Sequence, residues 1–223
     1  HLTRLLSAAA ESSPHRTAVT DGTRSLTYRE LDVASNRLAR VLIDGGAGPE
    51  RHVAVALPRG VEWMTTMWAI ARTGAAWVPI DPAYPAGRIE HMLTDSGARL
   101  LVTDRASDPR AGGEITTVVL DDPDTRTRID AESPAPVTDS DRRGVLDVDQ
   151  PAYLIYTSGT TGTPKGVVVG HRGLADFGAQ QVTQYGITPG SRTMHMASPS
   201  FDASVLEILM AISAGSTMHI VPP

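Results

Sequence analysis

The sequence contains no cysteine, which excludes disulfide bonds and thiolate metal sites. Its formal net charge is −5, so it lacks the basic excess that a nucleic-acid-binding surface requires. No apolar run approaches the roughly 18 residues of a membrane span, and the first residues lack the apolar core and cleavage site of a signal peptide. The seven histidines show no metal-ligand spacing. These absences predict a cytoplasmic protein that binds neither nucleic acid nor membranes.

Two further absences concern the start of the chain and its basic residues. The 223 residues do not begin with methionine, which predicts that they begin inside a longer natural chain. Among the 20 basic residues only Lys165 is a lysine, and the others are arginines. Hydrophobic residues make up 41% of the sequence, as in ordinary globular domains, and the length suits one large domain or two small ones.

Expected strands and helices alternate along most of the chain. Thr27 and Glu30 fit a capping box that opens a helix ending at Gly45-Gly46. The other helices are expected at residues 1–13, 58–73, 86–96, 172–185 and 203–214, and the strands at 17–20, at the residues leading to 26, and at 52–57, 75–80, 99–102, 115–120, 192–196 and 217–221. Such alternation predicts an α/β fold with largely parallel sheets flanked by helices.

The stretch Asp121–Asp149 differs from the rest of the sequence. It is rich in Asp, Pro, Ser, Thr and Arg and shows no sustained periodicity. We interpret it as a polar surface connection with room for one short helix. It would join two subregions, at about residues 1–121 and 150–223, of one incomplete large N-terminal domain that spans residues 1–223.

The most informative stretch contains a loop of hydroxyl residues and glycines, Thr157–Gly166, between the apolar runs Tyr153–Tyr156 and Val167–Val169. This pattern predicts a strand, a flexible turn and a second strand. Glycines let backbone N–H groups approach an anion, hydroxyls donate to phosphate oxygens, and Lys165 supplies a positive charge. The loop therefore suits phosphate binding, although a solvated hairpin turn explains its composition about equally well.

The loop does not follow the common nucleotide-binding patterns. The fifth position after Gly159 is Pro164, and Gly166 follows Lys165, so the pattern Gly-x-x-x-x-Gly-Lys-Ser/Thr is absent. The dinucleotide pattern Gly-x-Gly-x-x-Gly is absent as well. No Gly-x-Ser-x-Gly elbow occurs, which argues against a hydrolase of that class.

Four motifs in this order resemble the adenylate-forming enzymes. Tyr156–Gly166, YTSGTTGTPKG, resembles their signature loop. Leu26–Leu31, Arg72–Pro82 and Phe201–Ser204 narrow the resemblance to the amino-acid-activating adenylation domains of nonribosomal peptide synthetases, and it covers the chain nearly end to end. The second of these three motifs departs from the usual residues at Arg72, Thr73 and Trp77, and we interpret that motif as structural.

The resemblance implies a role for the loop. In such enzymes a substrate carboxylate attacks the α-phosphorus of Mg-ATP and expels pyrophosphate, and the acyl-adenylate then passes to the phosphopantetheine thiol of a peptidyl carrier protein. The residues implied to steady the β- and γ-phosphates are Thr157, Ser158, Gly159, Thr160, Thr161, Gly162 and Lys165. The Mg²⁺ ligand, the adenine contacts and a catalytic lysine belong to later parts of such domains, including the C-terminal domain, so we expect the 223 residues to be inactive alone.

The resemblance also implies a substrate site at the start of the last helix. Asp202 would pair with the α-ammonium of an amino acid, and Ala203 and Leu206 would line the pocket for its side chain, favouring an apolar or aromatic substrate. Each residue has a simpler interpretation. Asp202 suits the N-cap of this helix, and Ala203 and Leu206 suit plain core packing.

Three classes of function follow. The first is a part of an amino-acid-activating ligase of antibiotic biosynthesis that works with the rest of its adenylation domain. The second is an acyl- or aryl-acid ligase of the same superfamily, against which Asp202 argues because such a substrate has no amino group. The third is a non-enzymatic phosphate-binding module.

Overall fold

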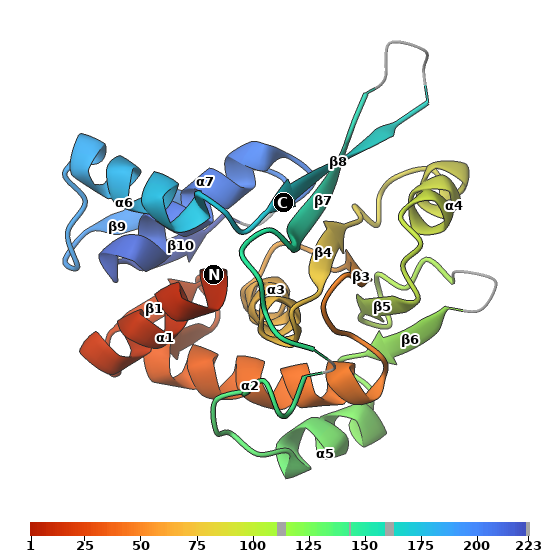
Figure 1. Ribbon diagram of the computed structural model, residues 1–223, viewed down its shortest axis with the longest axis horizontal. Helices are drawn as coiled ribbons and strands as arrows, with labels where there is room; N and C mark the ends of the chain where they lie inside the picture. Colours follow the sequence, from red (N-terminus) through yellow and green to blue (C-terminus); the bar gives the residue numbers. More distant parts are fainter. Residues whose placement is uncertain (111–114, 143, 159–162, 222–223) are drawn as a thin grey trace.

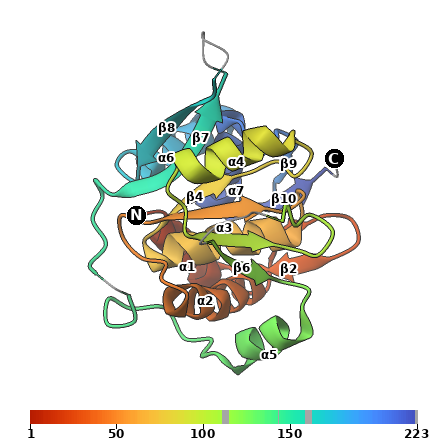
Figure 2. The same ribbon diagram turned by 90° about the vertical axis from the view of Figure 1, so that its right-hand side faces the viewer.

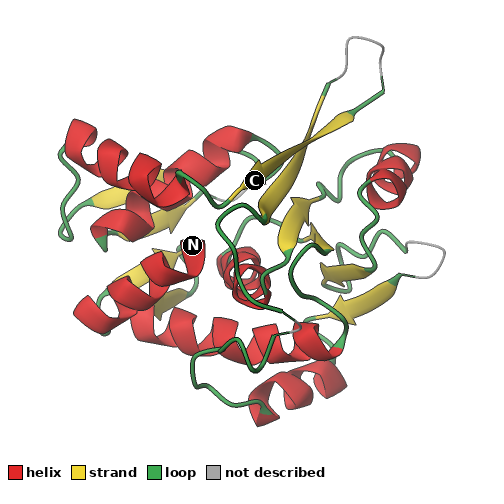
Figure 3. Ribbon diagram, in the orientation of Figure 1, coloured by secondary structure: helices red, strands yellow, loops and turns green. Residues whose placement is uncertain are grey.

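The computed structural model describes residues 1–110, 115–142, 144–158 and 163–221. Its strands form two sheets, and helices cover them (Figures 1 and 3). The first sheet has the order β2-β1-β10-β9, with β1 Thr17–Thr20, β2 Ser25–Thr27, β9 Arg192–His195 and β10 Thr217–Ile220. The second has the order β6-β5-β3-β4-β7-β8, with β3 His52–Ala56, β4 Ala76–Pro79, β5 Leu100–Thr103, β6 Thr116–Val119, β7 Pro151–Thr157 and β8 Lys165–Gly170.

The two sheets are parallel apart from two hairpins, β1–β2 and β7–β8. The helices are α1 Leu2–Ser12, α2 Tyr28–Asp44, α3 Val61–Thr73, α4 Ala86–Asp95, α5 Pro123–Ala131, α6 Leu174–Tyr185 and α7 Asp202–Ala214. The predicted α/β class and the order of elements are confirmed. The boundaries differ by a few residues: the helix expected from residue 58 begins at Val61, and the one expected from residue 172 begins at Leu174.

Helix α3 lies in the centre of the molecule, between the two sheets (Figure 1). Met64 and Trp68 line a small internal void together with Val19 of β1 and Met218 of β10, while Trp63 and Met67 are equally buried. A helix that is apolar around its circumference is stable only where protein surrounds it. This explains why the Trp- and Met-rich segment forms the axis of the fold.

The start of α2 follows from its sequence. The Thr27 hydroxyl accepts from the Glu30 N–H at 3.2 Å, and the Glu30 carboxylate accepts from the Thr27 N–H at 2.8 Å, so the predicted capping box is present. Among the described residues no helix is both long enough and apolar enough to cross a membrane.

The polar connection between residues 121 and 149 lies against α2 and contains the short helix α5, which buries none of its residues (Figure 2). Arg40 of α2 donates to the carbonyl oxygens of Ser133 and Ala135 at 3.0 and 2.8 Å. Arg142 donates to the Arg72 carbonyl at the end of α3, at 2.7 Å. Both sheets combine strands from before and after this connection, so it does not separate two structural units.

Candidate functional site

The glycine- and hydroxyl-rich loop joins β7 to β8, as the sequence predicts. These strands pair antiparallel from Tyr153 opposite Val169 to Thr157 opposite Lys165. Both extend away from the neighbouring strands (Figures 1 and 2). Thr157, Ser158 and Lys165 are exposed, and the predicted residues Gly159, Thr160, Thr161 and Gly162 lie outside the described part of the structure.

The charge of Lys165 suits an anion. No hydrogen bond or ion pair joins its ammonium group to a described residue, so no protein carboxylate in that part of the chain competes with a ligand for it. Exposed hydroxyls of Thr157 and Ser158 begin the same loop. These donors fit phosphate oxygens, which accept hydrogen bonds and carry negative charge.

Helix α4 holds the base of this hairpin. The Tyr156 phenol donates to the Asp95 carboxylate at 2.7 Å, and burial, together with that carboxylate, raises the pKa of the Tyr156 phenol. On the other arm, His91 Nε2 lies 3.1 Å from the Pro164 carbonyl oxygen. Because a carbonyl only accepts, Nε2 carries the proton in this contact. One helix thus fixes both arms of the loop next to Lys165.

His171 follows β8 and is buried, with 3% of its surface exposed. Neither ring nitrogen forms a hydrogen bond with a described residue. Burial lowers the pKa of His171 to about 4, and the positive N-terminus adds to this effect. The imidazole is therefore neutral at physiological pH.

We expect His171 to make the fold sensitive to mild acid. The unfolded chain binds a proton at this position near pH 6.5, whereas the folded protein binds it only near pH 4. The free energy of unfolding should therefore fall by about 3 kcal/mol as the pH drops from 7 to 4. Urea unfolding at a series of pH values measures this slope, and His171→Phe should remove that part of it. An identical pH profile for both proteins would contradict the assignment.

The predicted substrate residues share one side of α7. Asp202 and Ala203 are exposed and Leu206 is half-buried, whereas the buried side of the helix consists of Ser204, Val205, Ile208, Leu209, Ala211 and Ile212. Positions three and four apart lie on the same face of a helix, which places Leu206 beside Asp202 and Ala203. Core packing is therefore wrong as an interpretation of Ala203, and it does not describe Leu206 fully.

Asp202 is the first residue of α7 and does not cap it. The N-cap is Phe201, and no side-chain hydrogen bond caps this end, so the capping interpretation of Asp202 is wrong. Its carboxylate forms no hydrogen bond or ion pair with a described residue. After burial, the charge of Asp202 is the second cause that raises the pKa of the Tyr153 phenol. Tyr153 belongs to β7, so the charge of Asp202 acts on the strand that leads into the loop Thr157–Gly166.

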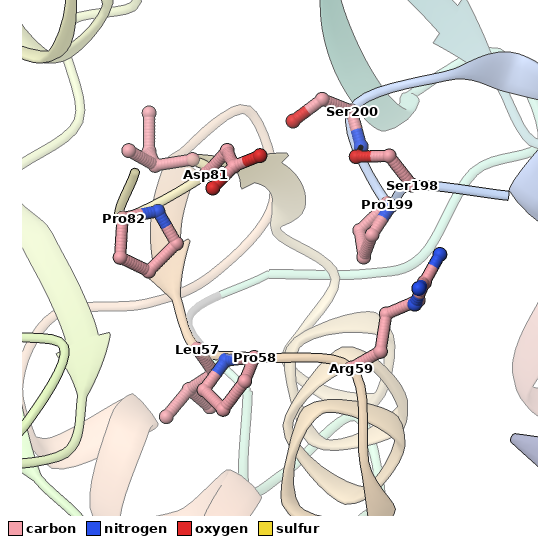
Figure 4. A pocket seen from close by; sticks show the side chains of 9 residues that line it. Leu57, Pro58, Arg59, Asp81, Pro82, Ser198, Pro199 and Ser200 are labelled. Atoms are coloured by element: carbon pink, nitrogen blue, oxygen red, sulfur yellow. Dashed lines mark hydrogen bonds between the residues drawn. The ribbon is translucent and has the colours of Figure 1, made fainter. Parts of the chain in front are cut away.

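A cavity of about 140 Å³ lies near these residues, where β3 and β4 end. Figure 4 shows Asp81 on one side of the cavity, with Ser198, Ser200 and Arg59 on the other. Ligands of open α/β sheets bind outside the carboxyl ends of the strands, which is where this cavity lies. None of the predicted site residues lines it, but the segment Ser198–Ser200 leads directly to Asp202.

The residues of this cavity are not among those predicted from the sequence. Asp81 belongs to the motif Arg72–Pro82, which the sequence indicates as structural, and Arg59 and Ser198 carry no pattern that singles them out. The positions of Arg59 and Asp81 directly after two expected strands are the available signal, because such positions meet at one edge of a parallel sheet. Among the described residues, no three His, Asp or Glu side chains form a group that could hold a metal ion.

The structure is a two-sheet α/β domain with a projecting hairpin whose exposed hydroxyl and lysine side chains suit an anion. The family model described as "AMP-binding enzyme" matches residues 6–223, so the chain belongs to the AMP-binding enzyme family. It is 45% identical over 222 residues to the probable non-canonical nonribosomal peptide synthetase CymA of Salinispora arenicola, covering 100% of this chain and 3% of that protein. The resemblance to adenylation domains of nonribosomal peptide synthetases is thus confirmed.

Solved structures agree with this assignment. The nonribosomal peptide synthetase FmoA3 (S1046A) superposes with a TM-score of 0.88 at 32% identity, covering 100% of this chain and 23% of that one. The N-terminal subdomain of Klebsiella oxytoca NpsA, in complex with 3-hydroxybenzoyl-AMSN, gives 0.84 at 32% identity, covering 99% and 53%. The chain matches part of the N-terminal subdomain: it spans 53% of the NpsA subdomain, 23% of the FmoA3 chain and 3% of CymA.

Proposed function

We propose that this chain is the part of an amino-acid adenylation domain that holds the pyrophosphate end of ATP and the α-ammonium of the amino acid. In the reaction an oxygen of the amino-acid carboxylate forms a bond to the α-phosphorus, the bond from that phosphorus to pyrophosphate breaks, and pyrophosphate leaves with the electron pair. One observation carries the proposal: the charge of the exposed Asp202 carboxylate raises the pKa of the Tyr153 phenol, and Tyr153 belongs to β7, the strand that leads into the loop ending at Lys165.

The charges suit the two substrates. Lys165 offers a cation to the phosphates, and the N–H and hydroxyl groups of the loop that begins at Thr157 add donors where negative charge leaves. Asp202 offers an anion to the ammonium group, and Ala203 and Leu206 on the same face offer small and apolar surface to its side chain. Mg²⁺ would be needed to bind ATP, and we place its carboxylate ligand outside this chain.

The remaining roles belong to the same proposal. The aminoacyl-adenylate would pass to the phosphopantetheine thiol of a peptidyl carrier protein, and NpsA, a structural relative, has been solved as an artificial fusion to such a domain. The rest of the adenylation domain would complete the site, in the cytoplasm. The rest of the domain could cover exposed apolar side chains on the edge strands β8 and β9. These side chains are Val167, Val168 and Met194.

Aryl-acid activation is the second candidate, because the NpsA subdomain binds a hydroxybenzoyl adenylate analogue. Asp202 distinguishes the two, since only an amino acid brings a positive charge to it. We expect Asp202→Ala to lower amino-acid-dependent ATP–pyrophosphate exchange roughly 10- to 150-fold, because a hydrogen bond to a charged group is lost. Exchange with aryl acids should be unaffected.

The experiment uses the natural polypeptide that carries this sequence, a panel of amino and aryl acids, and the 223-residue chain alone, which we expect to be inactive. Asp176→Ala is the matched control, because it removes an exposed acid from the first turn of α6. Retained amino-acid activation in Asp202→Ala would refute its role. A charged amino acid as best substrate would refute the apolar pocket, and no exchange with any acid would favour a non-enzymatic phosphate-binding module.

A further inference from the structure

Glu207 of α7 holds the turn between β9 and α7. Its Oε2 accepts from His195 Nδ1 at 2.9 Å and from the Met196 N–H at 3.0 Å, and the carboxylate accepts from the Ala197 N–H at 3.2 Å. A carboxylate only accepts, so His195 carries its proton on Nδ1. One side chain thus joins the end of β9, the first two peptide groups of the turn and the second turn of α7.

The contact between Glu207 and His195 lies against the core of the domain. His195 has 0% of its surface exposed and lies beside Trp63 of α3, with ring centroids 6.1 Å apart. From the opposite side Arg59 donates to the Met196 carbonyl oxygen. The peptide at residues 196–197 is therefore held by Glu207 through its N–H groups and by Arg59 through its carbonyl.

This turn leads to the substrate residues. The Phe201 N–H donates to the Ser198 carbonyl at 2.9 Å, and the Ser204 hydroxyl donates to the Phe201 carbonyl at 2.6 Å. Asp202 lies between these two bonds. The same turn supplies Ser198 and Ser200 to the cavity wall opposite Asp81 (Figure 4).

We infer that Glu207 is a positioning residue for amino-acid binding: it fixes the β9–α7 turn and thereby sets where Asp202 presents its carboxylate. The inference rests on the proposed role of Asp202. Glu207 touches neither Lys165 nor a described residue of the β7–β8 loop, so its effect is confined to the amino-acid side of the site. An amide in place of this carboxylate weakens the contacts at Oε2, because the negative charge is lost, and puts an NH₂ group, which only donates, at Oε1, 3.3 Å from the Ala197 N–H.

Glu207→Gln in the natural polypeptide is the test, because it conserves size. We expect the KM for the amino acid to rise roughly 5- to 20-fold, as for the weakening of one or two hydrogen bonds, while the KM for ATP and kcat stay within about twofold. Glu11→Gln, an exposed acid on α1, is the control and should change nothing. Equal changes in all three parameters, or none, would overturn the inference.

A second measurement does not depend on activity. In the 223-residue chain, Glu207→Gln should weaken the hydrogen-exchange protection of the Met196 and Ala197 amides and shift the NMR signals of Asp202 and of the His195 Nδ1 proton. Unchanged protection and unchanged Asp202 signals would overturn the inference even if the polypeptide proved inactive. Absence of amino-acid-dependent exchange in the wild type would instead refute the proposed function, so the two failures are distinguishable.

Discussion

Replacing Asp32 by alanine is expected to lower the free energy of unfolding by about 3–5 kcal/mol, the usual cost of leaving one partner of a buried ion pair alone. Asp32 of α2 accepts from Arg72 of α3 at 2.6 Å, and their side chains are 9% and 3% exposed. Burial lowers the pKa of Arg72 and the charge of Asp32 opposes this, which shows how far the guanidinium depends on its partner. Without Asp32, the side-chain partner that Arg72 keeps among the described residues is the Ser35 hydroxyl, 2.9 Å from its Nε.

Urea unfolding followed by circular dichroism measures this loss, and the melting temperature should fall by roughly 8–16 °C. Asp130→Ala is the control, because its contact with Arg37 is exposed and should contribute less than about 1 kcal/mol. The double variant Asp32→Leu/Arg72→Met should regain most of the stability, since apolar groups of similar volume often replace a buried pair without cost. A loss below about 1 kcal/mol for Asp32→Ala would show that Arg72 finds another partner.

Replacing Lys165 by methionine should lower ATP-dependent exchange in the natural polypeptide roughly 10²- to 10³-fold, as for loss of one group that stabilises developing negative charge. The physical reason is that Lys165 provides a cation at the loop and is not paired with a described carboxylate. For the same reason the stability should change by less than about 0.5 kcal/mol. Lys165→Arg should retain part of the activity, because the charge remains while the point-like geometry is lost.

The single lysine also permits a direct binding measurement. In the 223-residue chain, an amine-acylating reagent can modify only Lys165 and the N-terminal amine, and mass spectrometry separates the two products. ATP or pyrophosphate should slow acylation of Lys165 and leave the N-terminus unaffected. Arg192→Met, which removes an exposed cation from β9, is the matched control and should not alter this protection. Unprotected Lys165 together with normal exchange in Lys165→Met would exclude the phosphate role.

Sequence motifs were sufficient for the class of fold, because alternating apolar strands and amphipathic helices leave few other architectures. They also marked Asp202 and Lys165 as candidate site residues, since the signature loop and Phe201–Ser204 are local patterns. They failed where a residue's role depends on a distant partner. Arg72 stood in the motif as a minor departure, and its buried pair with Asp32 is 40 residues away.

The residues of the cavity and of the β9–α7 turn show the same limit. Glu207 is an ordinary helical acid in the sequence, and its function depends on β9 ending beside α7. Arg59 and Ser198 are 139 positions apart and meet only because strands of the two sheets end at the same place around α3. No local propensity encodes such an approach.

The loop Thr157–Gly166 shows both what the sequence determines and what the tertiary structure determines. Its composition alone indicates a turn that offers hydroxyl donors and one lysine to an anion, because glycine freedom and hydroxyl chemistry are properties of the residues themselves. Only the tertiary structure decided that α4 holds both arms of the loop through Tyr156 and His91, and that the charge of Asp202 acts on Tyr153 of its first strand. Those contacts join segments far apart in the chain, and packing around α3 brings them together.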